Sequence, residues 1–155
     1  MTRLQSTTYG HTQASPLCLI LYAAAAWFFA LTWFLQKEPW VSVVLALAGF
    51  VMLVVAASFQ RLTVEDEGEH LLIHFGPLPL FRKRVRYADI REVETGRTTF
   101  FDGWGIHWSP WGGWLWNVWG YDCVVIRLEK RVLRVGTDDP QGLAEFLRSR
   151  IALAR

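Results

Sequence analysis

Tryptophan, an aromatic side chain suited to binding because it joins a large apolar ring to one N–H donor, is concentrated in one part of this chain. The stretch 103–122, GWGIHWSPWGGWLWNVWGYD, holds six of the nine tryptophans. Such a set can form the core of a small sheet, a contact with the bilayer or another subunit, or a platform for a small ligand. The candidate partner or membrane contacts are Trp104, Trp108, Trp111, Trp114, Trp116 and Trp119.

The glycines and the proline within this stretch predict a β-hairpin. GWGIHWS forms one strand, PWGG the turn and WLWNVWG the partner strand. Strand alternation then places Trp114 and Trp116 on one face and Trp119 on the other. A domain of about 95 residues has a single core and cannot bury indoles from both faces. Some of these indoles should therefore lie on the surface.

A second candidate surface is a ladder of arginines. Arg82, Arg84 and Arg86 stand two apart, so a strand points all three to one face, and Arg61 lies where the apolar region ends. Beside a membrane they could meet anionic headgroups, each basic residue contributing about 1 kcal/mol. The other interpretation is a solvated edge strand protected by its charge. Four acidic residues nearby in the sequence would weaken the field of the ladder: Glu65, Asp66, Glu67 and Glu69.

The sequence lacks the usual signatures of catalysis and of metal binding. No carboxylate–histidine or HExxH spacing accompanies the histidines, and Ser109 precedes a proline without the context of a nucleophile elbow. No CxxC or Cys/His spacing is present, and Cys18 and Cys123 are expected to be small buried hydrophobes. A net charge of +2 is too small to indicate nucleic acid binding. We expect no enzyme activity, no cofactor, no metal and no nucleic acid partner.

The elements that carry these residues divide the chain into two unlike halves. Residues 17–35 and 40–59 contain no Asp, Glu, Lys or Arg, whereas nearly every charged residue follows position 60. Each run has close to the roughly 20 residues that cross about 30 Å of hydrocarbon as a helix. The short linker requires an antiparallel return, and Pro39 is well placed to begin the second helix. We expect a tail over 1–16, followed by a transmembrane hairpin over 17–60.

The charges that flank the hairpin predict its orientation. Two crossings place both ends of the chain on one side, and Arg3 and Arg61 at the outer ends, against Lys37 in the loop, favour cytoplasmic termini. Small residues along both runs predict close helix packing, and the absence of a mid-span charge argues against a pump or a pore. A secretory signal peptide is the alternative, but the first run is longer than usual and QKEPW offers no small-residue cleavage site.

From Arg61 onward, short alternating segments predict six or seven antiparallel strands followed by one helix. The helix begins near Asp138 or Asp139 and presents Arg148 and Arg150 to solvent. Strands and helix together suit a small barrel or sandwich whose open end the helix covers. The apolar stripe of the helix consists of Leu143, Phe146, Leu147 and Ile151.

The phrases YADIREVE, GWGIHW, WLWNVWG, VVIRLE and LRVGTDDPQGLAEFL resemble bacterial membrane-anchored pleckstrin-homology-like (PH-like) proteins. The resemblance covers residues 61–155, and a preceding helix hairpin is usual there. It implies an α+β membrane protein with a PH-like antiparallel β-barrel or sandwich, capped by a C-terminal amphipathic helix. The expected function is that of a non-enzymatic inner-membrane protein whose cytoplasmic domain binds protein partners or copies of itself. The alternative is a module that recognises anionic headgroups through the arginine ladder.

Overall fold

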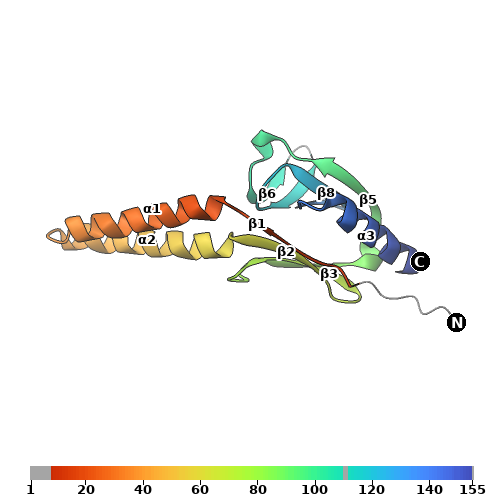
Figure 1. Ribbon diagram of the computed structural model, residues 1–155, viewed down its shortest axis with the longest axis horizontal. Helices are drawn as coiled ribbons and strands as arrows, with labels where there is room; N and C mark the ends of the chain where they lie inside the picture. The colour runs from red at the N-terminus through yellow and green to blue at the C-terminus, as the bar shows by residue number, and fades with distance from the viewer. Residues whose placement is uncertain (1–7, 110–111, 155) are drawn as a thin grey trace.

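The protein consists of a long helical hairpin and a β-domain at one end of it (Figure 1). The structure is a computed structural model and describes residues 8–109 and 112–154. The described chain begins and ends in the domain, with both long helices in between. Any arrangement in which both helices cross a membrane therefore leaves the two ends on the same side.

The hairpin is formed by α1 (Leu17–Phe34) and α2 (Pro39–Ser58), which pack against each other in antiparallel directions. This confirms the predicted helical runs, and Pro39 begins α2. Small residues allow the close approach, because a Cβ atom at Gly49 would lie 3.2 Å from the ring of Phe29. Both helices are long and apolar enough to span a membrane.

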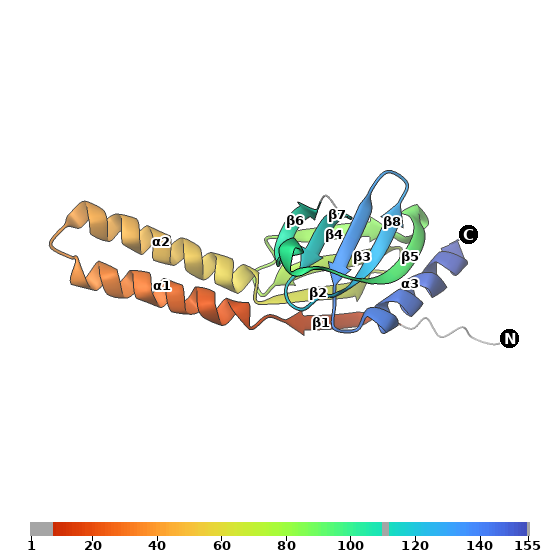
Figure 2. The ribbon, with the colours of Figure 1, turned by 90° about the horizontal axis from the view of Figure 1, so that it is seen from above.

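The domain is built from two sheets packed face to face, whose strands cross at a steep angle (Figure 2). The first sheet has the order β1 (Gly10–Ala14), β2 (Arg61–Asp66), β3 (His70–Gly76), β4 (Arg82–Arg86). The second has the order β5 (Ile90–Arg97), β8 (Asp122–Leu128), β9 (Val132–Gly136), β7 (Gly113–Asn117), β6 (Gly105–Ser109).

The strand arrangement corrects the prediction in two respects. The described chain has eight strands from Arg61 onward, where six or seven were expected. It also contains one parallel pair, because β9 inserts between β7 and β8 and runs alongside β7. Residue alternation reports that a segment is a strand, but it carries no information on strand order. The antiparallel expectation holds for the other neighbouring pairs.

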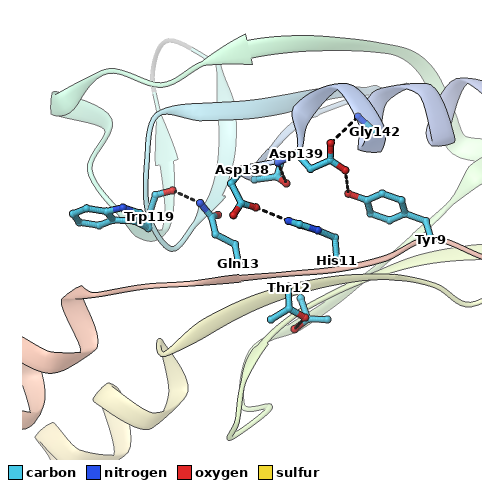
Figure 3. Close-up of polar contacts among 10 residues, drawn as sticks. Tyr9, His11, Thr12, Gln13, Trp119, Asp138, Asp139 and Gly142 are labelled. Atoms are coloured by element: carbon cyan, nitrogen blue, oxygen red, sulfur yellow. Dashed lines mark hydrogen bonds and ion pairs between the residues drawn. The ribbon is translucent and has the colours of Figure 1, made fainter.

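The segment expected to be an N-terminal tail contains a strand. β1 pairs with β2 and directs alternate side chains toward the second sheet and the start of the last helix (Figure 3). The Tyr9 hydroxyl donates to Asp139 at 3.3 Å, His11 contacts Asp138, and the buried Gln13 amide donates to the carbonyl of Trp119 at 3.0 Å. β1 therefore joins the two sheets along one side of the domain.

The C-terminal helix α3 (Pro140–Ala154) covers the domain next to β5 and the short 3₁₀ helix η1 (Tyr87–Asp89). Asp139 caps it by accepting from the N–H of Gly142 at 3.1 Å, and its predicted apolar stripe is buried. The prediction that Arg150 faces solvent was wrong, because its side chain is largely covered. Its guanidinium forms an ion pair with the buried carboxylate of Asp66, because the long side chain folds back over the aromatic rings beneath the helix.

Candidate functional site

The tryptophan-rich stretch forms the predicted hairpin of β6 and β7. In its register Gly105 faces Asn117 and Trp108 faces Trp114. This pair lies toward the end of the two strands, where Trp108 is 60% exposed and Trp114 is 44% exposed. β6 is the last strand of its sheet, so the pair lies beside an edge that has no neighbouring strand in the described part of the chain.

Trp116 corrects the expectation that all six tryptophans are candidates for surface contact. It is only 7% exposed, and its ring centroid lies 5.7 Å from that of Phe75 in the opposite sheet. Trp116 shares a face with Trp114 but sits further along β7, where the first sheet covers it. The ammonium of Lys83 lies 5.7 Å from the Trp116 ring centroid. Burial, and then the charge of Arg131, lower the pKa of this lysine.

A second aromatic cluster lies where the domain meets the hairpin. Trp104 stacks on Trp119 with ring centroids 5.2 Å apart and planes 17° from parallel, and its indole donates to the carbonyl of Gly120 at 3.3 Å. The rings of Phe100 and Tyr121 adjoin Trp104. A cavity of about 210 Å³ separates Trp104 from the helices. Its lining includes Leu17, Cys18, Leu21, Val55, Phe59, Trp104 and Val118.

A buried polar network holds the loop that carries this second cluster. Asp102 ends the 3₁₀ helix η2 (Phe100–Asp102) and accepts from the hydroxyl of Ser109 at 2.7 Å and from the N–H of Thr99 at 2.8 Å. The guanidinium of Arg134 lies 3.7 Å from Asp102. Burial alone would raise the pKa of Asp102, but these hydrogen bonds and the arginine outweigh it and lower the pKa. The network fastens η2 to the outer face of the second sheet.

The arginine ladder occupies β4, and all three of its side chains are exposed. Arg84 makes a bidentate pair with Glu67 at 2.7 and 3.2 Å, and Arg86 makes one with Asp89 at 3.0 and 3.1 Å. Arg82 begins β4, at the end of the strand that lies toward the helices. Arg61 begins β2 at that same end of the sheet. The ladder is thus split into two cations beside the hairpin and two ion pairs further away.

Trp111 lies outside the described residues. Among the residues that are described, no group of three or more His, Cys, Asp or Glu side chains is placed to hold a metal ion. Cys18 and Cys123 are both buried and unpaired with each other, and burial raises the pKa of Cys123.

Sequence reasoning missed the most exposed aromatic and apolar side chains beside the hairpin. Phe100 and Phe101 are 68% and 95% exposed, and the adjacent pair of phenylalanines in a loop was the available signal. Phe81 lies in the loop before β4 and is exposed. Leu78 and Leu80 are exposed in the same loop.

No protein-family model matches the chain, and no curated protein matches it either.

Proposed function

We propose that this chain is an integral membrane protein whose hairpin crosses the bilayer twice and whose PH-like domain associates with a second copy of itself on the cytoplasmic side of a bacterial inner membrane. The function is one of binding and involves no catalysis. Two apolar helices of 18 and 20 residues support the anchor. The resemblance of the domain sequence to membrane-anchored PH-like proteins supports the remainder.

The observation that carries the binding function is the exposed pair of Trp108 and Trp114 beside β6, the end strand of its sheet among the described residues. Large exposed indoles are frequent hot spots when an interface buries them. An unpaired edge strand offers backbone N–H and C=O groups to a neighbour. Together they suit a two-fold contact in which Trp108 and Trp114 of one copy pack against the same pair of another.

The membrane anchor favours a second copy as the partner. The strands of the second sheet cross the direction of the hairpin (Figure 2), and two copies in one bilayer stand at the same height, so Trp108 and Trp114 of one copy can meet the same pair of a neighbour. Confinement of both copies to one bilayer also raises their effective concentration. Recognition of anionic lipid by the full arginine ladder receives less support, because Arg84 and Arg86 are already ion-paired.

Analytical ultracentrifugation of the full-length protein in mild detergent tests this function. The wild type should sediment as a dimer at micromolar concentration, and Trp108→Ala and Trp114→Ala should shift it toward the monomer. Trp33→Ala is the matched control, because Trp33 is also an exposed tryptophan but lies at the far tip of the hairpin. A monomeric wild type at every concentration would overturn self-association.

A further inference from the structure

We infer that the face of the domain around the base of the hairpin is a lipid-contacting surface, with two apolar loops lying in the headgroup layer on opposite flanks of the helices. The first is loop 78–81 and the second is the segment 100–101. This inference rests on the proposed membrane insertion. It adds that the domain itself touches lipid in a fixed orientation.

The lengths of the helices leave no room between the domain and the bilayer. α1 has 18 residues, which at about 1.5 Å each gives a helix of about 27 Å. The hydrocarbon core is about 30 Å thick, and the headgroup layers extend the bilayer to about 40–45 Å. The whole of each helix is therefore needed to cross the core. The side chains that surround the ends of the helices nearest the domain must therefore lie at the depth of the headgroups.

The strands run into the helices without a linker. Ala14 of β1 faces Arg61 of β2, and the N–H of Ser15 donates to the carbonyl of Gln60 at 2.9 Å. α1 begins at Leu17, and α2 has ended at Ser58. The first sheet thus continues to the start of the hairpin, so the domain cannot tilt away freely from the helices.

Loop 78–81 lies on the α2 flank of the hairpin. Phe81 packs on Phe59, the residue that follows α2, with ring centroids 5.4 Å apart. Leu80 is 60% exposed, and Leu78 is exposed as well. Figure 1 shows this loop reaching from the end of β3 toward α2. The loop therefore lies beside the end of α2, where the helix enters the domain.

The segment 100–101 lies on the other flank. Phe100 contacts Trp104, with ring centroids 6.4 Å apart, and Trp104 lines the cavity beside Leu17 in the first turn of α1. Phe101 next to it is almost fully exposed. Neighbouring exposed apolar side chains of this kind mark sites of protein or membrane interaction. Because these side chains adjoin two apolar helices, we assign them to contact with the membrane and not with a protein.

The charges around this surface fit the same occupant. Arg61 and Arg82 lie at the hairpin end of the first sheet. The acidic turn that begins at Asp66 lies at the opposite end of β2, which is about 17 Å away for five steps of about 3.3 Å. Acidic residues that are close to the arginines in the sequence are thus separated from Arg61 in space. Cations beside apolar side chains are the usual composition of an interfacial contact.

Single-cysteine variants of the full chain in phospholipid vesicles test the inference. Both native cysteines are first replaced, as Cys18→Ser and Cys123→Ala. A fluorophore is then attached at Leu80→Cys or Phe101→Cys, and its quenching by lipid that carries a spin label near the headgroup is measured. Leu47→Cys, in the outward face of α2, reports whether the hairpin is inserted. Glu145→Cys, exposed on α3 beside Tyr9 at the far end of the domain, is the matched control outside the bilayer.

We expect the fluorophores at positions 80 and 101 to lose most of their emission to the spin-labelled lipid and the one at 145 to lose none. Position 47 should be quenched by a label placed deeper in the acyl chain. Quenching at 47 without quenching at 80 and 101 would overturn the lipid-contacting surface while the anchor stands. If the fluorophore at position 47 were not quenched, the hairpin would not be inserted and the proposed membrane anchor would be wrong.

Discussion

Ala14 and Arg61 face each other in the register of β1 and β2 at the point where the sheet passes into the two helices. The helical hairpin is therefore inserted between two neighbouring strands of one sheet. Both of its connections are held by the same ladder of hydrogen bonds, which ends with Ser15 and Gln60. This relationship couples the position of the domain to that of the hairpin, so the face of the domain next to the helices keeps a fixed place relative to them.

Trp116 and Trp114 share a face of β7 but differ in burial, so they separate core packing from surface binding. Trp116→Ala should lower the free energy of unfolding by about 3–5 kcal/mol, because it opens a cavity against Phe75. Trp114→Ala should cost much less stability and should weaken self-association. Thermal melting of both variants by near-UV circular dichroism checks the contrast. If both variants lost the same stability and neither changed self-association, Trp114 would be a core residue like Trp116 and not part of a contact surface.

Asp66 holds α3 in place and should be sensitive to loss of its charge. It accepts from the hydroxyl of Tyr87 at 2.8 Å and pairs with Arg150. Asp66→Asn leaves that guanidinium buried without a counter-charge, which typically costs about 3–5 kcal/mol. Chemical denaturation of the full chain in detergent measures the loss. Glu67→Gln, beside it in a surface ion pair with Arg84, should cost at most about 1 kcal/mol; a similar loss in both variants would contradict the prediction.

Asp102 should make stability depend on pH on the acid side. Its pKa is lower in the folded protein than in the unfolded chain, so its contribution is present above the unfolded value of about 3.9 and is lost as pH falls through the folded value. Asp102→Asn should lower stability at pH 7 by about 1–3 kcal/mol and reduce the loss on acidification. Melting curves at pH 7 and in acid check both. Asp122→Asn is the control, because it removes only an exposed ion pair with Arg97. It should change neither the stability at pH 7 nor the loss of stability in acid.

Arg61 and Arg82 should matter for lipid contact where Arg86 does not. Replacing both by Gln should decrease the quenching of a fluorophore at position 80 in vesicles that contain anionic lipid, because two cations near the headgroups are lost. In zwitterionic vesicles the change should be small. Arg86→Gln is the control, since its guanidinium is paired with Asp89 at the far end of β4. An equal decrease in the control would contradict the assignment.

Much of the fold followed from residue patterns, because long apolar runs, alternation and helical spacing are local properties. The hairpin, the start of α2 at Pro39 and the buried stripe of α3 were predicted in this way. β1 was missed because GHTQA shows no apolar alternation. That strand is held by β2 and by polar contacts from His11 and Gln13 to residues more than a hundred positions away.

The candidate site was less predictable, because exposure depends on what covers a residue. Trp114 and Trp116 have the same orientation on one strand, and only the position of the opposite sheet separates them. Arg84 and Glu67 are distant in sequence but are brought together by the pairing of β3 with β4. Local patterns contain neither fact. They located the surface in the chain but did not show which side chains form it.

The central claim is that the hairpin crosses the bilayer, which places the loop between the helices and the domain on opposite sides of the membrane. In bacterial cells that express the full chain in the Cys18→Ser, Cys123→Ala background, Lys37→Cys in the exposed loop between the helices and Glu145→Cys in the domain are each treated with a membrane-impermeant maleimide. We predict labelling at position 37 in intact cells and at position 145 only after the membrane is permeabilised. Labelling of both positions in intact cells would contradict a hairpin that crosses the bilayer and a domain held on its cytoplasmic side.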